Sequence, residues 1–89
     1  MDEKMIKYIM ENQRFKTYEI RRQDETVEIE NEKYLISVTF YHQAIAEEMI
    51  YDKKEKDPFF YFHHECLNDH QTLSYINDFL NIAVELTSC

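Results

Sequence analysis

Glycine is absent from the sequence, and proline occurs once. Without glycine, the chain lacks the loops through which backbone amides approach a phosphate, and the strained turn that presents a hydrolase serine. Nucleotide-dependent enzymes and α/β-hydrolases are therefore disfavoured. Tight turns must instead use Asn or Asp, which adopt a left-handed conformation more readily than most residues. We expect turns at Asp24, at Asn31 and in the loop 53–58.

Cysteines and long apolar segments are also scarce. The two cysteines, Cys66 and Cys89, are far apart in sequence, so the disulfide framework of a small secreted domain is not expected. The longest uninterrupted apolar run is Phe59–Phe62, so neither a signal peptide nor a membrane span is predicted. A chain of 89 residues can bury one core, and we expect residues 1–89 to form a single cytoplasmic domain with no membrane partner.

Basic residues are outnumbered, with 10 Lys and Arg against 18 Asp and Glu and a formal net charge of −8. Such a charge disfavours direct binding of DNA or RNA. It attracts a basic protein surface, including the groove that a nucleic-acid enzyme offers to phosphates. The alternative is a solvated strand whose charges maintain solubility. The predicted partner-binding residues lie between positions 24 and 32 with no basic residue among them: Asp24, Glu25, Glu28, Glu30 and Glu32.

The hydrophobic pattern predicts one helix followed by strands. Within residues 3–13, Ile6, Ile9, Met10 and Gln13 recur at helical spacing. The next segments alternate apolar and polar side chains, which is typical of strands with one buried face. The predicted strands are "FKTYEIRR" (15–22), "TVEIE" (26–30) and "KYLISVTF" (33–40).

The segment 44–52 is ambiguous between helix and strand. The spacing of Ile45 and Met49 and the local propensity favour a helix. We predict a strand, because the neighbouring segment 59–66 reads clearly as one and the charged loop ending in Pro58 suits a hairpin.

The aromatic segment "FFYF" is apolar on both faces of its strand, with Phe59 and Tyr61 on one side and Phe60 and Phe62 on the other. Both faces need cover. Either the two helices flank the sheet on opposite sides, or both lie on one face and the other meets a partner or a second copy. We expect the first arrangement, with 59–66 as a central strand of a monomer.

The last segment, from Asn68 to about Leu86, has the pattern of a long helix. Asn68 can cap its first turn, and Gln71 can return the hydrogen bond. The expected apolar stripe consists of Leu73, Ile76, Leu80, Ala83 and Val84, with Tyr75, Phe79, Ile82 and Leu86 beside it.

A metal or catalytic site is conceivable around residues 63–70. His64, Cys66 and His70 could converge on a tetrahedral zinc ion, but their spacing matches none of the usual Cys and His zinc motifs. A cysteine nucleophile with a histidine base is also conceivable, but no oxyanion loop is recognisable. We therefore predict no catalytic residues, no metal and no cofactor.

The sequence as a whole predicts an α+β domain with an N-terminal helix, an antiparallel sheet of four or five strands and a long C-terminal helix packed on the sheet. Its predicted role is that of a small acidic protein-binding module rather than an enzyme, and in particular an inhibitor or regulator of a basic, nucleic-acid-handling protein. The alternative is a structural or metal-stabilised homodimer that associates through the 59–66 strand.

Overall fold

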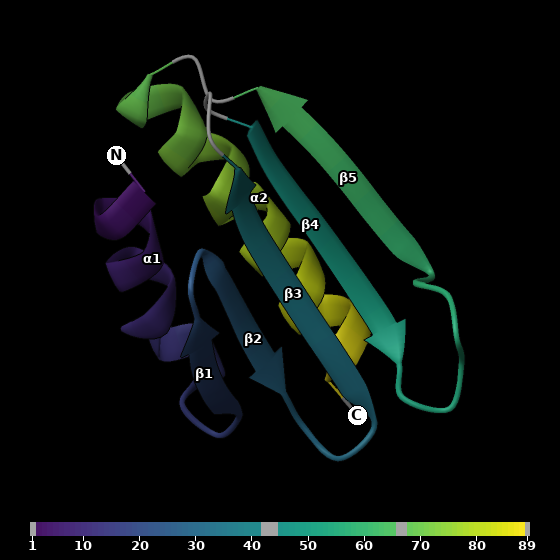
Figure 1. Cartoon of the computed structure of the whole chain (residues 1–89). Helices are drawn as coiled ribbons and strands as arrows, with labels where there is room; N and C mark the ends of the chain where they lie inside the picture. The colour runs from purple at the N-terminus through teal and green to yellow at the C-terminus, as the bar shows by residue number, and fades with distance from the viewer. Residues whose placement is uncertain (1, 42–44, 66–67, 89) are drawn as a thin grey trace.

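The computed structural model describes residues 2–41, 45–65 and 68–88, which form two helices and a five-stranded antiparallel sheet (Figure 1). The strands follow one another in the sheet in chain order, β1-β2-β3-β4-β5. This architecture confirms the predicted α+β class. The elements are α1 (Asp2–Met10), the 3₁₀ turn η1 (Gln13–Phe15), β1 (Glu19–Gln23), β2 (Thr26–Glu30), β3 (Tyr34–Tyr41), β4 (Ile45–Asp52), β5 (Phe60–Glu65) and α2 (Asp69–Thr87).

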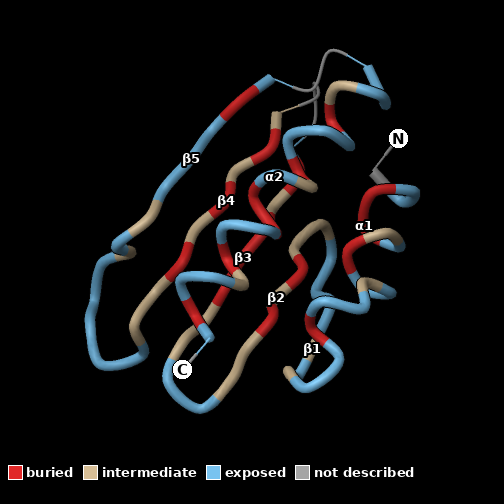
Figure 2. The backbone as a smooth tube through the Cα atoms, turned by 180° about the vertical axis from the view of Figure 1, so that it is seen from behind, coloured by how far each residue is buried: buried red, intermediate tan, exposed pale blue. Residues whose placement is uncertain are grey.

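Both helices lie on the same face of the sheet, with α2 over its middle strands and α1 beside it (Figures 1 and 2). Polar contacts join the two helical segments: the Tyr8 hydroxyl donates to Asn77 Oδ1 at 2.9 Å, and Arg14 Nε donates to Asn81 Oδ1 at 2.8 Å. One apolar core fills the space between helices and sheet, and it consists of Met5, Ile6, Ile9, Phe15, Val27, Ile29, Ile36, Val38, Phe40, Ala46, Ile50, Ile76, Phe79, Leu80 and Ala83.

The expectation that the helices flank opposite faces is therefore wrong, and so is the central position of the 59–66 segment. Because each strand pairs with the next in sequence, β5 pairs with β4 alone among the described strands and lies at the edge of the sheet. Phe60 points to the helices, where its ring centroid is 5.8 Å from that of Phe79. Tyr61 points to the other face and is exposed.

The N-terminal helix is shorter than predicted. It ends at Met10, and the Asn12 side chain then accepts a hydrogen bond from the Arg14 amide at 3.0 Å, which starts the 3₁₀ turn that buries Phe15. The buried face of α1 consists of Met5, Ile6 and Ile9, and Met10 retains 37 % of its surface. The expected strand from residue 15 begins only at Glu19, because the preceding residues belong to this turn.

The predicted turns at Asp24 and Asn31 are formed in two different ways. Asp24 has a φ of 54°, the only positive φ among the described residues, so it supplies the left-handed conformation of the β1–β2 turn. Asn31 does not adopt this conformation. Its side-chain Oδ1 instead accepts hydrogen bonds from the amides of Lys33 and Tyr34, at 3.0 and 2.8 Å, and thereby closes the β2–β3 turn.

The ambiguous segment is the strand β4, whose described part begins at Ile45. It pairs with β3 on one side and β5 on the other, and in this register Ile50 lies between Ile36 and Phe60. Ala46, Glu48 and Ile50 alternate toward the core. Cross-strand packing on both sides thus outweighs the local helix propensity.

The C-terminal helix begins as predicted, with Asn68 Oδ1 accepting from the Gln71 amide at 2.8 Å. The return bond is not formed: Gln71 Oε1 is buried and has no hydrogen-bond partner among the described residues. Leu73, expected on the apolar stripe, is exposed, because the buried face is rotated toward Thr72. The buried residues of α2 are Thr72, Ile76, Phe79, Leu80, Ala83 and Thr87. Neither helix, over the residues described, has the length and apolar content to span a bilayer.

Candidate protein-binding surface

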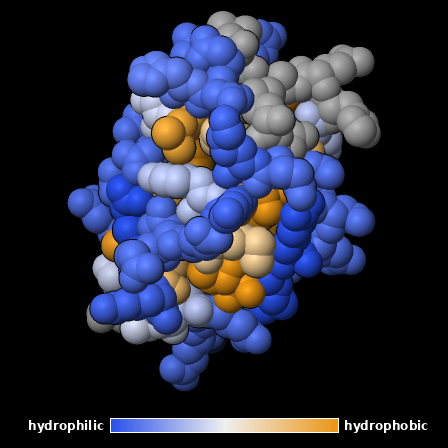
Figure 3. Space-filling model, turned by 90° about the vertical axis from the view of Figure 1, so that its left-hand side faces the viewer, coloured by the Kyte–Doolittle hydropathy of each residue, from blue (hydrophilic) through white to orange (hydrophobic). Residues whose placement is uncertain are grey.

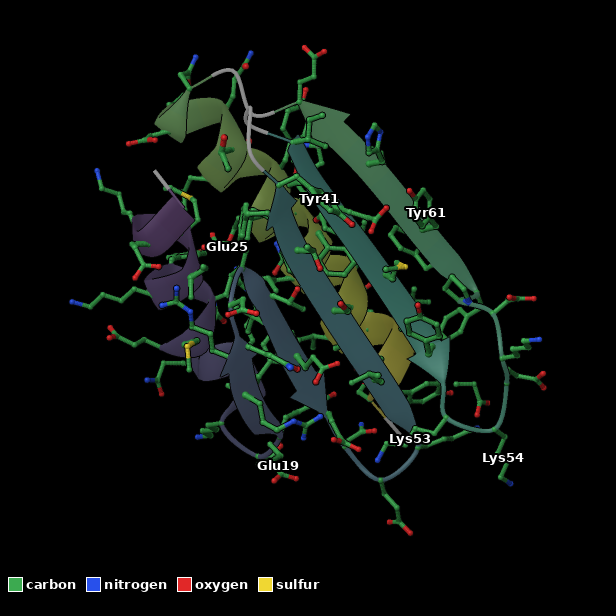
Figure 4. All side chains as sticks on the ribbon, viewed as in Figure 1. Glu19, Glu25, Tyr41, Lys53, Lys54 and Tyr61 are labelled. Atoms are coloured by element: carbon green, nitrogen blue, oxygen red, sulfur yellow. The ribbon has the colours of Figure 1, made fainter. Side chains whose placement is uncertain are left out.

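The face of the sheet turned away from both helices is covered by none of the described elements, and we call it the open face (Figure 4). Because side chains alternate along each strand, the registers assign every second residue to it. Its residues are Glu19, Arg21 and Gln23 on β1, Thr26, Glu28 and Glu30 on β2, Leu35, Ser37, Thr39 and Tyr41 on β3, Ile45, Glu47, Met49 and Tyr51 on β4, and Tyr61, His63 and Glu65 on β5.

Two of the predicted partner-binding residues, Glu28 and Glu30, lie together on this face. Arg21 on the neighbouring strand contacts both carboxylates, with Nη2 3.3 Å from Glu28 Oε1 and Nη1 2.5 Å from Glu30 Oε1. Lys53 forms a second ion pair with Glu30. Hydrogen bonds from Lys53 and Arg21 lower the pKa of Glu30, so this carboxyl stays ionised. The acidic strand is thus partly neutralised by Arg21 and Lys53.

The other three predicted residues are not part of the same cluster. Asp24 and Glu25 lie in the β1–β2 turn, at one end of β2, and Glu32 lies in the β2–β3 turn at its other end. The five acidic residues are therefore neighbours in sequence but are spread along the full length of a strand. The sequence did contain a signal for the contact of Arg21 with this cluster. The β1–β2 hairpin pattern places Arg21 directly opposite Glu28 when the two strands pair antiparallel.

A second cluster, which sequence analysis missed, lies on β3, β4 and β5. The Tyr41 hydroxyl donates to Glu47 Oε1 at 2.9 Å, and the Tyr61 hydroxyl donates to Glu47 Oε2 at 2.6 Å. These hydrogen bonds to the carboxylate raise the pKa of both tyrosines. Tyr41 is 46 % exposed and Tyr61 is 55 % exposed, and they lie on either side of β4 (Figure 4). We call these three residues the tyrosine–glutamate cluster.

Apolar side chains surround this cluster on the open face. Ile45, Met49 and Tyr51 on β4 and Leu35 on β3 are half-buried. The Tyr51 hydroxyl contacts the sulfur of Met49 at 3.3 Å. The open face therefore has an acidic part on β1 and β2 and an aromatic, apolar part on β3 to β5. By contrast, the side of the molecule next to α1 is mostly hydrophilic, with apolar atoms in separate spots (Figure 3).

The aromatic part continues to the free edge of the sheet. Phe59 and Tyr61 are exposed there, and Phe62, which alternates to the helix-facing side of β5, retains 45 % of its surface. The β4–β5 register is unbroken from Phe60 to Glu65, and the strand contains neither Pro nor Lys. Proteins usually protect an edge strand with a bulge, a proline or a lysine, and β5 has none of these three.

His64, the first of the three candidate zinc ligands, belongs to the core. Its Nε2 lies 2.6 Å from Glu48 Oε1, and its ring packs against that of Tyr75 with centroids 4.6 Å apart. Burial raises the pKa of Glu48 to about 8 and lowers the pKa of His64, so the pair is neutral at pH 7. His70 is exposed in the first turn of α2, and Cys66 lies outside the described residues. No group of three potential ligands is arranged to hold a metal within the described residues.

A pocket of about 690 Å³ lies at the end of the molecule where the β2–β3 and β4–β5 loops meet the end of α2. Lys33, Lys53 and Lys54 contribute to its lining, but so do Glu32 and Asp52. Because cations and carboxylates alternate around it, the pocket has no pronounced preference for an anion or a cation. It therefore suggests no specific ligand.

No family model matches the chain, and no curated protein or solved structure matches it either. The chemistry of the surface is thus the basis for a functional assignment.

Proposed function

We propose that the chain is a protein-binding module that docks a basic partner protein on the open face of its sheet. The observation that carries this proposal is the placement of both helices on one side, which leaves the other side of the sheet without cover. That uncovered side combines exposed tyrosines with carboxylates. Tyrosine is enriched in protein interfaces because it offers a large apolar area and a polar hydroxyl at low entropic cost.

The charge of the open face selects the kind of partner. A face dominated by carboxylates steers a basic surface toward it and repels an acidic one. The same charge opposes nucleic acid as a direct ligand, whereas it suits the basic groove of a nucleic-acid-handling protein, which the module would inhibit or regulate. The charged strand residues of this face are Glu19, Glu28, Glu30, Glu47 and Glu65 against Arg21.

Affinity capture tests the proposal. The immobilised chain is incubated with lysate of its native host, bound proteins are eluted with increasing salt, and they are identified by mass spectrometry. We expect a basic protein whose affinity, measured with purified components, decreases with ionic strength. A purified partner that is acidic, or whose affinity is independent of salt, would contradict the proposal. Failure to retain any protein would contradict it as well.

A second candidate function is that of a structural homodimer, and the unprotected edge of β5 favours it. Two copies of β5 pairing antiparallel would extend the sheet and cover the exposed Phe62. This association would leave the open face accessible, so it is compatible with binding a further protein. Its test is the concentration dependence described in the Discussion.

A further inference from the structure

We infer that the tyrosine–glutamate cluster is a binding site for an arginine side chain of the partner protein, an assignment that rests on the proposed function. The cluster consists of a carboxylate held between two half-exposed phenol rings on three adjacent strands. Each component contributes separately to the recognition of a guanidinium group.

The carboxylate of Glu47 is oriented and still has acceptor positions to offer. Tyr41 donates to one of its oxygens and Tyr61 to the other. An ionised carboxylate has about four acceptor positions, so about two remain for a ligand. Because the two phenols hold the carboxylate in place, little conformational entropy is lost when a ligand binds. The planar fork of a guanidinium donates two parallel hydrogen bonds to such a group, which an ammonium group cannot do.

The two tyrosine rings provide the second part of the site. They lie on either side of Glu47, and each keeps about half of its surface exposed. A guanidinium stacks on aromatic faces and is more weakly hydrated than an ammonium, so it gives up less hydration on binding. Ile45 and Met49 on the same strand as Glu47 offer an apolar surface for the aliphatic part of an arginine side chain.

The charge around the cluster disfavours two other occupants, a second copy of the chain and an acidic ligand. The cation on the strands of the open face is Arg21, which lies on β1 and pairs with carboxylates of that strand and of β2. A second copy of the chain placed face to face would oppose two carboxylate-rich surfaces, and like charges across an interface disfavour association. An acidic ligand meets the same repulsion. A basic protein segment that contains arginine is the occupant that complements the site.

Two short peptides of equal charge test this inference, one with three arginines separated by threonines and one with three lysines in the same positions. Their affinities for the full chain are measured by fluorescence anisotropy at low salt. A cation–π contact of about 1 kcal/mol corresponds to about fivefold in affinity. We therefore expect the arginine peptide to bind about fivefold more tightly than the lysine peptide.

Substitutions in the cluster test whether the difference in affinity between the two peptides arises there. Glu47→Gln and Tyr61→Leu should reduce the arginine-to-lysine ratio to about one, since they remove the carboxylate and one ring. Glu85→Gln, which removes the same charge from the exposed side of α2, should leave the ratio unchanged. NMR shift mapping on the wild-type chain, independent of how any variant folds, should place the largest changes at Tyr41 and Tyr61.

The outcomes distinguish the inference from the proposed function. Equal affinities of the two peptides for the wild-type chain, with both sensitive to salt, would refute the arginine site and leave the basic-partner proposal intact. A ratio that Glu47→Gln does not change would refute the site too. Absence of binding by either peptide at low salt would overturn both proposals.

Discussion

Glu48 is a carboxylic acid on the helix-covered face of the sheet, with 1 % of its surface exposed. Its contact with His64 satisfies one carboxyl oxygen, and the other has no hydrogen-bond partner among the described residues. A buried carboxylate in this position would be poorly solvated, which is why burial raises the pKa of Glu48 to about 8. The residue is thus a titratable group within the core, and the stability of the fold should depend on its protonation.

The first prediction is a loss of stability with rising pH that Glu48 causes. The folded chain retains the Glu48 proton up to about pH 8, whereas the unfolded chain releases it near pH 4.5, so the free energy of unfolding falls as pH rises through this window. The lowered pKa of His64 acts in the opposite direction, but only below about pH 6.5. Between pH 6.5 and 8 we expect a loss of about 1–2 kcal/mol in urea unfolding.

The variant Glu48→Gln should lack this pH-dependent loss, because glutamine does not titrate. The matched control is Glu65→Gln, an exposed carboxyl on the neighbouring strand, which should behave like the wild-type chain. Identical pH profiles for the wild type and Glu48→Gln would show that Glu48 is ionised in the folded protein.

At the scale of single elements, the start of α2 depends on one side chain. Asn68 accepts the hydrogen bond of the Gln71 amide, and the reciprocal bond of a capping box is missing. We predict that Asn68→Ala lowers the free energy of unfolding by about 1 kcal/mol, whereas Asn68→Asp preserves it, because aspartate caps equally well. Thermal and urea unfolding measure the difference, and equal stability of all three proteins would show that this cap contributes nothing.

The edge strand β5 has one face toward the helices and one on the open face. Substitution of the adjacent residues Phe60 and Tyr61 measures how much each face contributes to stability. Phe60 packs against Phe79 of α2, so we predict that Phe60→Ala costs about 3 kcal/mol. Tyr61 is exposed on the open face, so Tyr61→Ala should cost less than about 1 kcal/mol. Urea unfolding of both variants is the measurement. A large loss for Tyr61→Ala would mean that the open face is covered in solution.

At the scale of the whole molecule, the formal charge of −8 should govern the rate of association with a basic partner. We predict that replacing Glu28 and Glu30 by Gln slows association about two- to fivefold at low salt, with little change in dissociation. Stopped-flow mixing with the captured partner gives both rates. The effect should disappear in high salt, and an effect confined to dissociation would instead indicate direct contacts at these two residues.

The oligomeric state is a second property of the whole molecule. Because the open face is acidic, we predict a monomer whose melting temperature is constant over a hundredfold dilution, with the monomer mass in light scattering. A homodimer formed through β5 would instead show a melting temperature that falls on dilution. In that case, Phe62→Lys should abolish the concentration dependence, since a lysine at the edge opposes strand pairing.

The sequence by itself determined the elements and their approximate boundaries. Alternation of apolar and polar residues identified β1, β2 and β3, and the long apolar stripe with Asn68 before it identified α2. The ambiguous segment 44–52 was assigned as a strand from its neighbours, the aromatic segment 59–66 and the charged loop between them. These signals are local, because a strand or helix with one buried face must repeat its apolar residues at a fixed period. The end of α1 was missed because the hydrogen bond of the Asn12 side chain overrides the helical pattern.

Only the tertiary structure decided which surfaces remain uncovered. Alternation shows that a strand has two faces, but not on which one the helices pack, and this choice follows from contacts such as that between Tyr8 and Asn77, which are distant in sequence. The tyrosine–glutamate cluster likewise forms only when β3, β4 and β5 pair in register. Proximity across three strands depends on the whole sheet, whereas the pairing of Arg21 with Glu28 follows from a single hairpin.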